Sequence, residues 1–105
     1  MAIRNVSIFQ VHPGRRQEFL KEVAEAKKIL ERLGVSFRAA ETIVGGPNTG
    51  NFVVALEFND MAAFAGFTQK AQADSEWQAF QAKLNGTSSP TRTLLSRSLL
   101  TDVQL

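Results

Sequence analysis

The chain has 105 residues, of which 44% are hydrophobic, and a formal net charge of +2. This length is typical of one domain with one modest core, so we expect a single domain over residues 1–105. Lys and Arg are interleaved with Asp and Glu, and this pattern does not indicate nucleic-acid binding.

The chain has no Cys and a single His, so disulfides, thiolate chemistry and a metal site are not expected. No apolar run approaches the roughly 20 residues of a membrane-spanning helix. The start of the chain lacks the apolar core of a signal peptide. We therefore expect a cytoplasmic protein with no membrane contact.

The first predicted elements are a strand over residues 3–11 and a long helix that begins near Arg15. Pro13-Gly14 is a turn signal and is expected to end the strand. Beyond it, apolar residues recur at helical spacing, which is typical of the buried stripe of an amphipathic helix. This stripe consists of Phe19, Val23, Ala26, Leu30 and Leu33. Gly34 follows at a position where helices favour a left-handed residue.

A hairpin is predicted next, with strands over residues 35–44 and 52–58. The connecting segment, Gly45-Gly-Pro-Asn-Thr-Gly50, is rich in residues that permit a positive φ or favour a turn. It lacks the Lys and the Ser or Thr of a phosphate-binding loop and leads into a strand rather than a helix. We therefore interpret it as a hairpin loop.

Two helical pieces and a last strand complete the chain. Asp60 suits the N-cap of a helix that continues to about Ala71, and Asp74 or Ser75 suits the N-cap of a second piece. The last strand is predicted over residues 92–103.

The resulting order is β-α-β-β-α-β. Each βαβ crossover is expected to be right-handed, with another strand inserted between its two strands. We therefore predict an α+β, ferredoxin-like fold with a four-stranded antiparallel sheet and both helical layers on one face.

The face of this sheet that the helices leave open is predicted to meet a partner. One face of the third strand carries Phe52, Val54, Leu56 and Phe58, and the other carries Val53 and Ala55. The last strand behaves alike, with Leu94 and Leu100 opposite Leu95 and Leu99. Because monomers rarely expose a large apolar patch, we predict a homodimer with sheet against sheet about a two-fold axis. The alternative is a monomer whose extra apolar groups are scattered surface residues.

Several segments together resemble the dimeric α/β-barrel superfamily, in particular NIPSNAP-like proteins and the antibiotic-biosynthesis-monooxygenase group. The matching segments are Phe9-Gln-Val-His-Pro-Gly14 before Glu18-Phe19-Leu20, Leu56-Glu57-Phe58 before Asp60, the helix with Glu76-Trp77 and Phe80, and the strand Leu95–Val103. The resemblance covers nearly the whole chain. It implies two protomers whose sheets face each other, each with a pocket between sheet and helices.

The superfamily includes cofactor-free oxygenases, haem-degrading enzymes, isomerases and members without a known activity. Haem-degrading members carry an Asn on the first strand, a Trp at the end of the third strand and a His in the second helical region. Here Asn5 and Ser7 lie near the first position, Phe58 takes the second, and residues 61–84 contain no His. The resemblance therefore does not extend to haem degradation, and no cofactor is expected.

Three residues are candidates for catalysis, each with a structural alternative. Glu57 is a carboxylate inside an apolar strand, where burial would raise its pKa and suit it to accept a proton. Its alternatives are an ion pair with Arg4 or Arg38, or an exposed strand end. His12 could act as a general base or acid, or could be an exposed residue of the Pro-Gly turn. Arg38 could line the cavity between the sheets, pair across the dimer or lie on a solvated edge.

Four residues are candidates for ligand binding. Asn5 and Ser7 share one face of the first strand and would supply polar groups if that face lines a cavity. Trp77 and Phe58, with neighbouring Phe residues, could form the wall of a pocket for a planar apolar ligand. The alternative for these aromatic side chains is ordinary packing of helix on sheet.

These observations lead to two functional hypotheses. In the first, the chain is a small homodimer that binds a small apolar or aromatic metabolite in a pocket between sheet and helices. In the second, it is a cofactor-independent oxygenase, isomerase or decarboxylase, which requires an acid or base beside the cavity.

Overall fold

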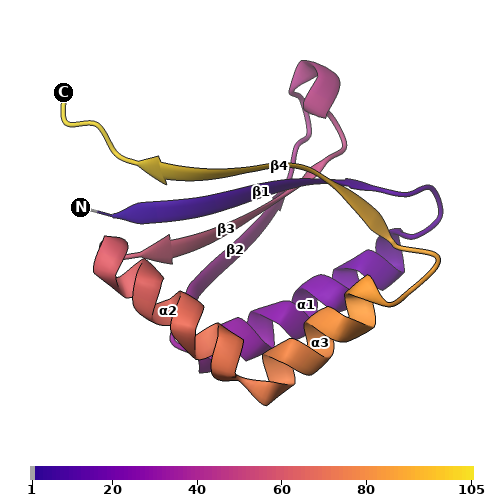
Figure 1. The fold of residues 1–105 in the computed structure, drawn as a ribbon. Coiled ribbons are helices and arrows are strands. Elements are labelled where there is room, and N and C mark those ends of the chain that lie inside the picture. The colour runs from indigo at the N-terminus through magenta and orange to yellow at the C-terminus, as the bar shows by residue number, and fades with distance from the viewer. Residues whose placement is uncertain (1) are drawn as a thin grey trace.

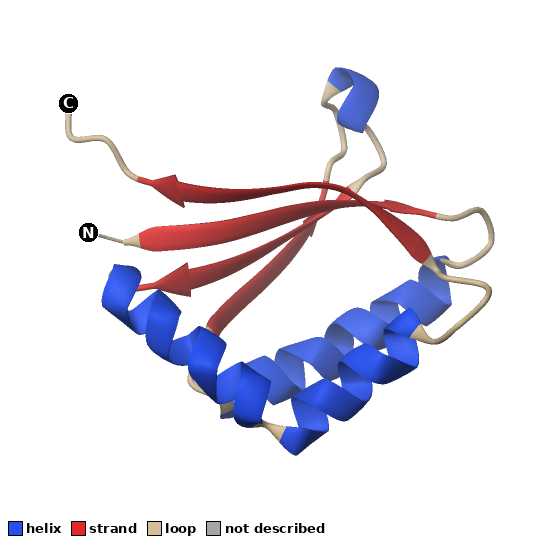
Figure 2. Ribbon diagram, in the orientation of Figure 1, coloured by secondary structure: helices blue, strands red, loops and turns tan. Residues whose placement is uncertain are grey.

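The computed structural model describes residues 2–105 and consists of one antiparallel sheet with its helices on one face (Figures 1 and 2). In chain order the elements are β1 (Ile3–Val11), α1 (Arg16–Arg32), β2 (Ser36–Glu41), the 3-10 turn η1 (Gly46–Asn48), β3 (Phe52–Phe58), α2 (Met61–Ala73), α3 (Ser75–Asn85) and β4 (Arg92–Thr101). The strand order is β2-β3-β1-β4. The predicted α+β, ferredoxin-like fold is therefore confirmed.

Strand β2 ends at Glu41, three residues before the end that the sequence predicts. Glu41 is paired with Phe52, the first residue of β3, so β3 offers no further strand residue with which β2 could pair. The hairpin loop then closes through hydrogen bonds from the Thr42 N–H to the Asn51 carbonyl (2.8 Å) and from the Gly50 N–H to the Thr42 carbonyl (2.7 Å). The apolar side chains at the start of this loop, Ile43 and Val44, are 83% and 87% exposed.

The pairing register determines which side chains face the helices. Ser7 on β1 lies opposite Val54 on β3 and Arg97 on β4, and these positions share the helix-covered face. The intervening positions, among them Val6 and Ile8, lie on the helix-free face.

A β-bulge in β4 changes the predicted faces of that strand. Ile8 pairs with Ser96 but Phe9 pairs with Leu94, so Leu95 is an extra residue. A single extra residue reverses the alternation of side chains beyond it. The expectation that Leu94 shares a face with Leu100 is therefore wrong, because Leu94 faces the helices whereas Leu100, opposite Arg4, does not.

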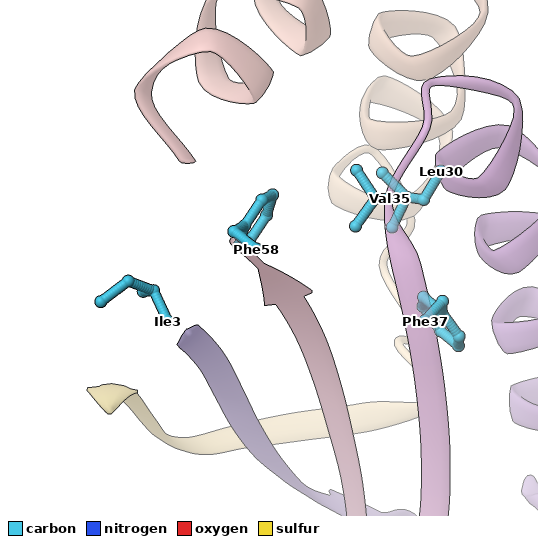
Figure 3. Close-up of a cluster of buried hydrophobic side chains, with 5 residues drawn as sticks. All are labelled: Ile3, Leu30, Val35, Phe37 and Phe58. Atoms are coloured by element: carbon cyan, nitrogen blue, oxygen red, sulfur yellow. The ribbon is translucent and has the colours of Figure 1, made fainter. Parts of the chain in front are cut away.

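The core joins one end of the sheet to the helices and the helices to one another. One cluster contains Ile3, Leu30, Val35, Phe37 and Phe58, which come from three strands, helix α1 and the turn after it (Figure 3). A second cluster, formed by Ile29, Phe80 and Leu84, packs α3 on α1. Burying apolar side chains of this size is the main stabilising contribution in a domain of this length.

Asp74 links all three helices. It ends α2, and its carboxylate caps α3 by accepting a hydrogen bond from the Trp77 N–H at 2.8 Å. The Arg32 guanidinium at the end of α1 binds both carboxylate oxygens at 2.8 Å. The pKa of Asp74 is lowered from its ordinary value of 3.8, first by the bond from Arg32 and then by the Trp77 N–H.

Replacing Asp74 by Asn should destabilise the protein at neutral pH and have little effect in acid. The amide keeps a capping oxygen but loses the charge that binds Arg32. Because the folded-state pKa is depressed, the ionised carboxylate stabilises the fold above the unfolded-state pKa, and this stabilisation is lost as the pH falls below about 4. Urea unfolding at pH 7, 5 and 3 would measure the free energies of unfolding of wild type and Asp74→Asn, which should become equal as the pH falls.

The matched control is Asp60→Asn. Asp60 caps α2 through the Ala63 N–H at 2.8 Å, and no arginine binds it within residues 2–105. A gap in unfolding free energy between wild type and Asp74→Asn that does not change between pH 7 and pH 3 would contradict the electrostatic role of Asp74.

Candidate functional site

A cavity of about 650 Å³ lies between the sheet and the three helices. Its floor is formed by residues of all four strands, with Phe37 from β2, and its walls by residues of α1, α2 and α3. This volume lies within the range of small-molecule pockets in proteins.

Most of the lining is apolar and aromatic. Phe9 and Phe37 contribute from the sheet, and Phe64, Phe67 and Trp77 from the helices. Rings on several sides suit a flat apolar molecule, because aromatic pairs favour stacked or edge-to-face contacts.

The floor also carries polar side chains. Asn5 and Ser7 both line the cavity, as their position on one strand face suggests. The Arg97 Nε–H donates a hydrogen bond to the Ser7 Oγ at 3.2 Å, which links this exposed arginine to the central strand. In the sequence Arg97 is one of several charges on the strands, and its spacing alone does not mark it as a cavity residue.

A second polar cluster lies where α1 approaches the start of β4. The Thr91 hydroxyl donates a hydrogen bond to the Glu22 carboxylate, and Arg92 Nη1 lies 3.6 Å from Glu22 Oε1. The Arg92 guanidinium also lies over the Phe9 ring, 5.7 Å from its centroid. The side chains of Arg92 and Glu22 are only 21% and 22% exposed, so this ion pair is shielded from much of the solvent.

Glu22 was not among the predicted cavity residues, although its helical spacing contains the signal. Glu22 lies three residues after Phe19 and four before Ala26, both of which belong to the apolar stripe of α1. A carboxylate beside a buried stripe requires a cation, which Arg92 supplies from the opposite end of the chain.

The structure does not bring the catalytic candidates Glu57, Arg38 and His12 together. Glu57 is exposed and lies opposite Arg4 and Ser36 on the helix-free face. Arg4 forms its ion pair with Asp102 instead. Arg38, on edge strand β2, is exposed and borders a separate, smaller depression between β2 and α1. None of the three candidates lines the main cavity.

His12 joins the turn after β1 to the start of β4. Its Nδ1 lies 2.8 Å from the Pro90 carbonyl oxygen and its Nε2 lies 2.7 Å from the Thr93 hydroxyl. A carbonyl oxygen only accepts, so Nδ1 carries a proton, and in the neutral ring Nε2 accepts from Thr93. Both ring nitrogens are therefore engaged, as expected for a structural His.

The two aromatic candidates lie in different surroundings. Trp77 lines the cavity and packs against Phe80 in a tilted arrangement, with ring centroids 5.6 Å apart. Phe58 is buried in the core, where its ring lies 5.2 Å from Phe64 and 5.3 Å from Phe67, and it does not line the cavity. Asn5, Ser7 and Trp77 thus line one cavity. Phe58 lies outside the lining and packs against Phe64 and Phe67, which belong to it.

Within residues 2–105, no group of three or more His, Cys, Asp or Glu side chains is placed to hold a metal ion. No helix in the same range is long and apolar enough to cross a membrane.

The fold is similar to that of several solved structures. No family model and no curated protein sequence matches the chain. A NIPSNAP family protein from Agrobacterium tumefaciens is 22% identical, with a TM-score of 0.71 over 98% of this chain and 94% of that one. An uncharacterized NIPSNAP domain protein from Burkholderia xenovorans is 19% identical, with a TM-score of 0.72 over 98% and 95%.

A mutant of SnoaB, a cofactor-independent oxygenase from Streptomyces nogalater, is 19% identical, with a TM-score of 0.67 over 99% of this chain and 95% of that one. At these identities the likeness concerns the fold. The resemblance that the sequence indicated is thereby confirmed at the level of structure: this chain has the ferredoxin-like fold shared by NIPSNAP proteins and a SnoaB-type oxygenase.

Proposed function

We propose that this protein binds a small, flat, apolar or aromatic molecule in the cavity between its sheet and helices. The observation that carries the proposal is the cavity of about 650 Å³, which aromatic side chains line from both the sheet and the helices. Such a lining fits an apolar ring system, and the polar side chains among the lining residues would orient it.

A cofactor-independent oxygenase, isomerase or decarboxylase activity remains the second candidate, supported by the structural likeness to SnoaB. This activity requires a free acid or base beside the ligand. Of the side chains that line the cavity, Glu22 carries the only carboxylate, and both Thr91 and Arg92 engage it. The arrangement of these groups therefore favours binding over proton transfer.

The binding proposal can be tested through Trp77, which is the only Trp in a chain without Tyr. Because Trp77 lines the cavity, titration with the neutral planar probe 2-naphthamide should change its fluorescence in a saturable way. At 100 times Kd the probe should raise Tm by roughly 10 °C, since it binds the folded state alone.

The variant Ala26→Leu should weaken binding of this probe at least about tenfold, because the added methyl groups project from α1 into the cavity. Ala82→Leu makes the same change at an exposed position of α3 outside the cavity and should bind as wild type does. Equal Kd values for the two variants, or no saturable change in wild type, would refute a binding site here.

We also propose that two copies of the chain associate through their helix-free sheet faces. The centre of this face carries Val6, Ile8, Val53 and Ala55, all of them only partly buried. Leu100 on the same face is 46% exposed. All three helices cover the other face (Figure 2), so a second copy would remove these side chains from water.

Sedimentation equilibrium at micromolar concentration should give twice the monomer mass for the wild type and the monomer mass for Ala55→Asp. A carboxylate in the middle of the joined sheets would lose its hydration, at a cost on the order of several kcal/mol. The matched control is Ala65→Asp, an exposed position on α2, which should remain a dimer. A monomeric wild type would rule out this association.

A further inference from the structure

We propose that the ligand carries a single negative charge on oxygen, as in an aromatic carboxylate, and that Arg97 binds it. This inference rests on the proposed binding function and specifies the chemical class of the ligand. It begins from the balance of charge inside the cavity.

The charged side chains that line the cavity are Glu22, Arg92 and Arg97. Glu22 and Arg92 form an ion pair and neutralise each other. Arg97 has no carboxylate within ion-pair distance among residues 2–105. The cavity therefore carries one surplus positive charge, and this charge lies on its floor.

This surplus is unusual within the chain. Most arginines bind a carboxylate: Arg4 binds Asp102, Arg15 binds Glu18, Arg16 binds Glu41, Arg32 binds Asp74 and Glu76, and Arg92 binds Glu22. In the described part of the chain the exceptions are Arg38 and Arg97. Arg38 does not line the cavity, whereas Arg97 does.

One hydrogen bond restrains the Arg97 side chain, which is otherwise exposed. Its Nε–H is donated to the Ser7 Oγ, and Ser7 is buried on the central strand β1. The N–H groups of both Nη atoms have no acceptor among the described residues. A guanidinium presents these groups as a planar fork that matches the two oxygens of a carboxylate.

The surroundings define the rest of the ligand. Asn5 and Ser7 lie on the floor near this guanidinium, and aromatic rings such as Phe64 and Trp77 line the helical walls. A ligand with a flat apolar body and an anionic oxygen at one edge would satisfy both regions. The favourable contact with Arg97 would offset the cost of removing the anion from water.

The experiment compares 2-naphthoate with 2-naphthamide, which share a ring system and differ in charge. Isothermal titration at neutral pH should show that wild type binds the carboxylate at least about tenfold more tightly than the amide. Arg97→Gln should lose this preference, so that its Kd values for the carboxylate and the amide agree within a factor of about two. Arg97→Lys, which keeps the charge but not the fork, should keep only part of the preference.

Arg38→Gln is the matched control, because it lowers the net charge of the protein by the same amount at a site outside the cavity. It should keep the full preference, which separates a contact with Arg97 from general attraction of an anion to a basic protein. Equal Kd values for carboxylate and amide, or a preference that persists in Arg97→Gln, would overturn the inference and leave the apolar binding site standing. Failure of both probes to bind would overturn the inference together with the proposed function.

Discussion

The ion pair between Arg32 and Asp74 lies at the point that shapes the cavity, where α2 meets α3. It holds the junction of α2 and α3 against the end of α1. From this junction α3 runs back beside α1 and packs on it through Phe80 and Leu84, rather than lying across β1 and β4 (Figure 1). The first helix covers β2, and α2 is anchored on the end of β3. The part of the sheet that remains beneath the helices becomes the floor of the cavity.

Much of this architecture could be predicted because local patterns determine it. The stripe from Phe19 to Leu33 requires a helix with one buried face, and Asp60 and Asp74 cap helices as their positions suggest. Strands β1 and β3 have the predicted bounds, since their apolar runs end at turns. The end of β2 was predicted too late, because Ile43 and Val44 favour a strand locally but have no residue to pair with.

The candidate site was harder to predict, because it depends on contacts between distant parts of the chain. Glu57 is a candidate in the sequence because it is a charge in an apolar strand. The alternation of side chains correctly places Glu57 and Phe58 on opposite faces of the sheet. Alternation alone does not say which face the helices cover, and Glu57 lies on the other one. Conversely, the sequence alone suggests that Glu22 lies on the solvated side of α1. Its role becomes visible only when the fold places Arg92, seventy residues later, beside it.

Strand β4 shows why the polar floor depends on the central strand. As an edge strand, β4 pairs on one side only, and its bulge at Leu95 interrupts the ladder between Leu94 and Arg97. Bulges occur beside functional sites, where they redirect side chains, and here the bulge allows Leu94 and Arg97 to face the same cavity. An arginine on such an edge would ordinarily be free to move in solvent. Ser7 is buried and belongs to β1, which is paired on both sides, so its backbone holds a fixed position. The hydrogen bond from Arg97 to Ser7 therefore limits the positions open to an exposed side chain that carries the one unbalanced charge of the cavity lining.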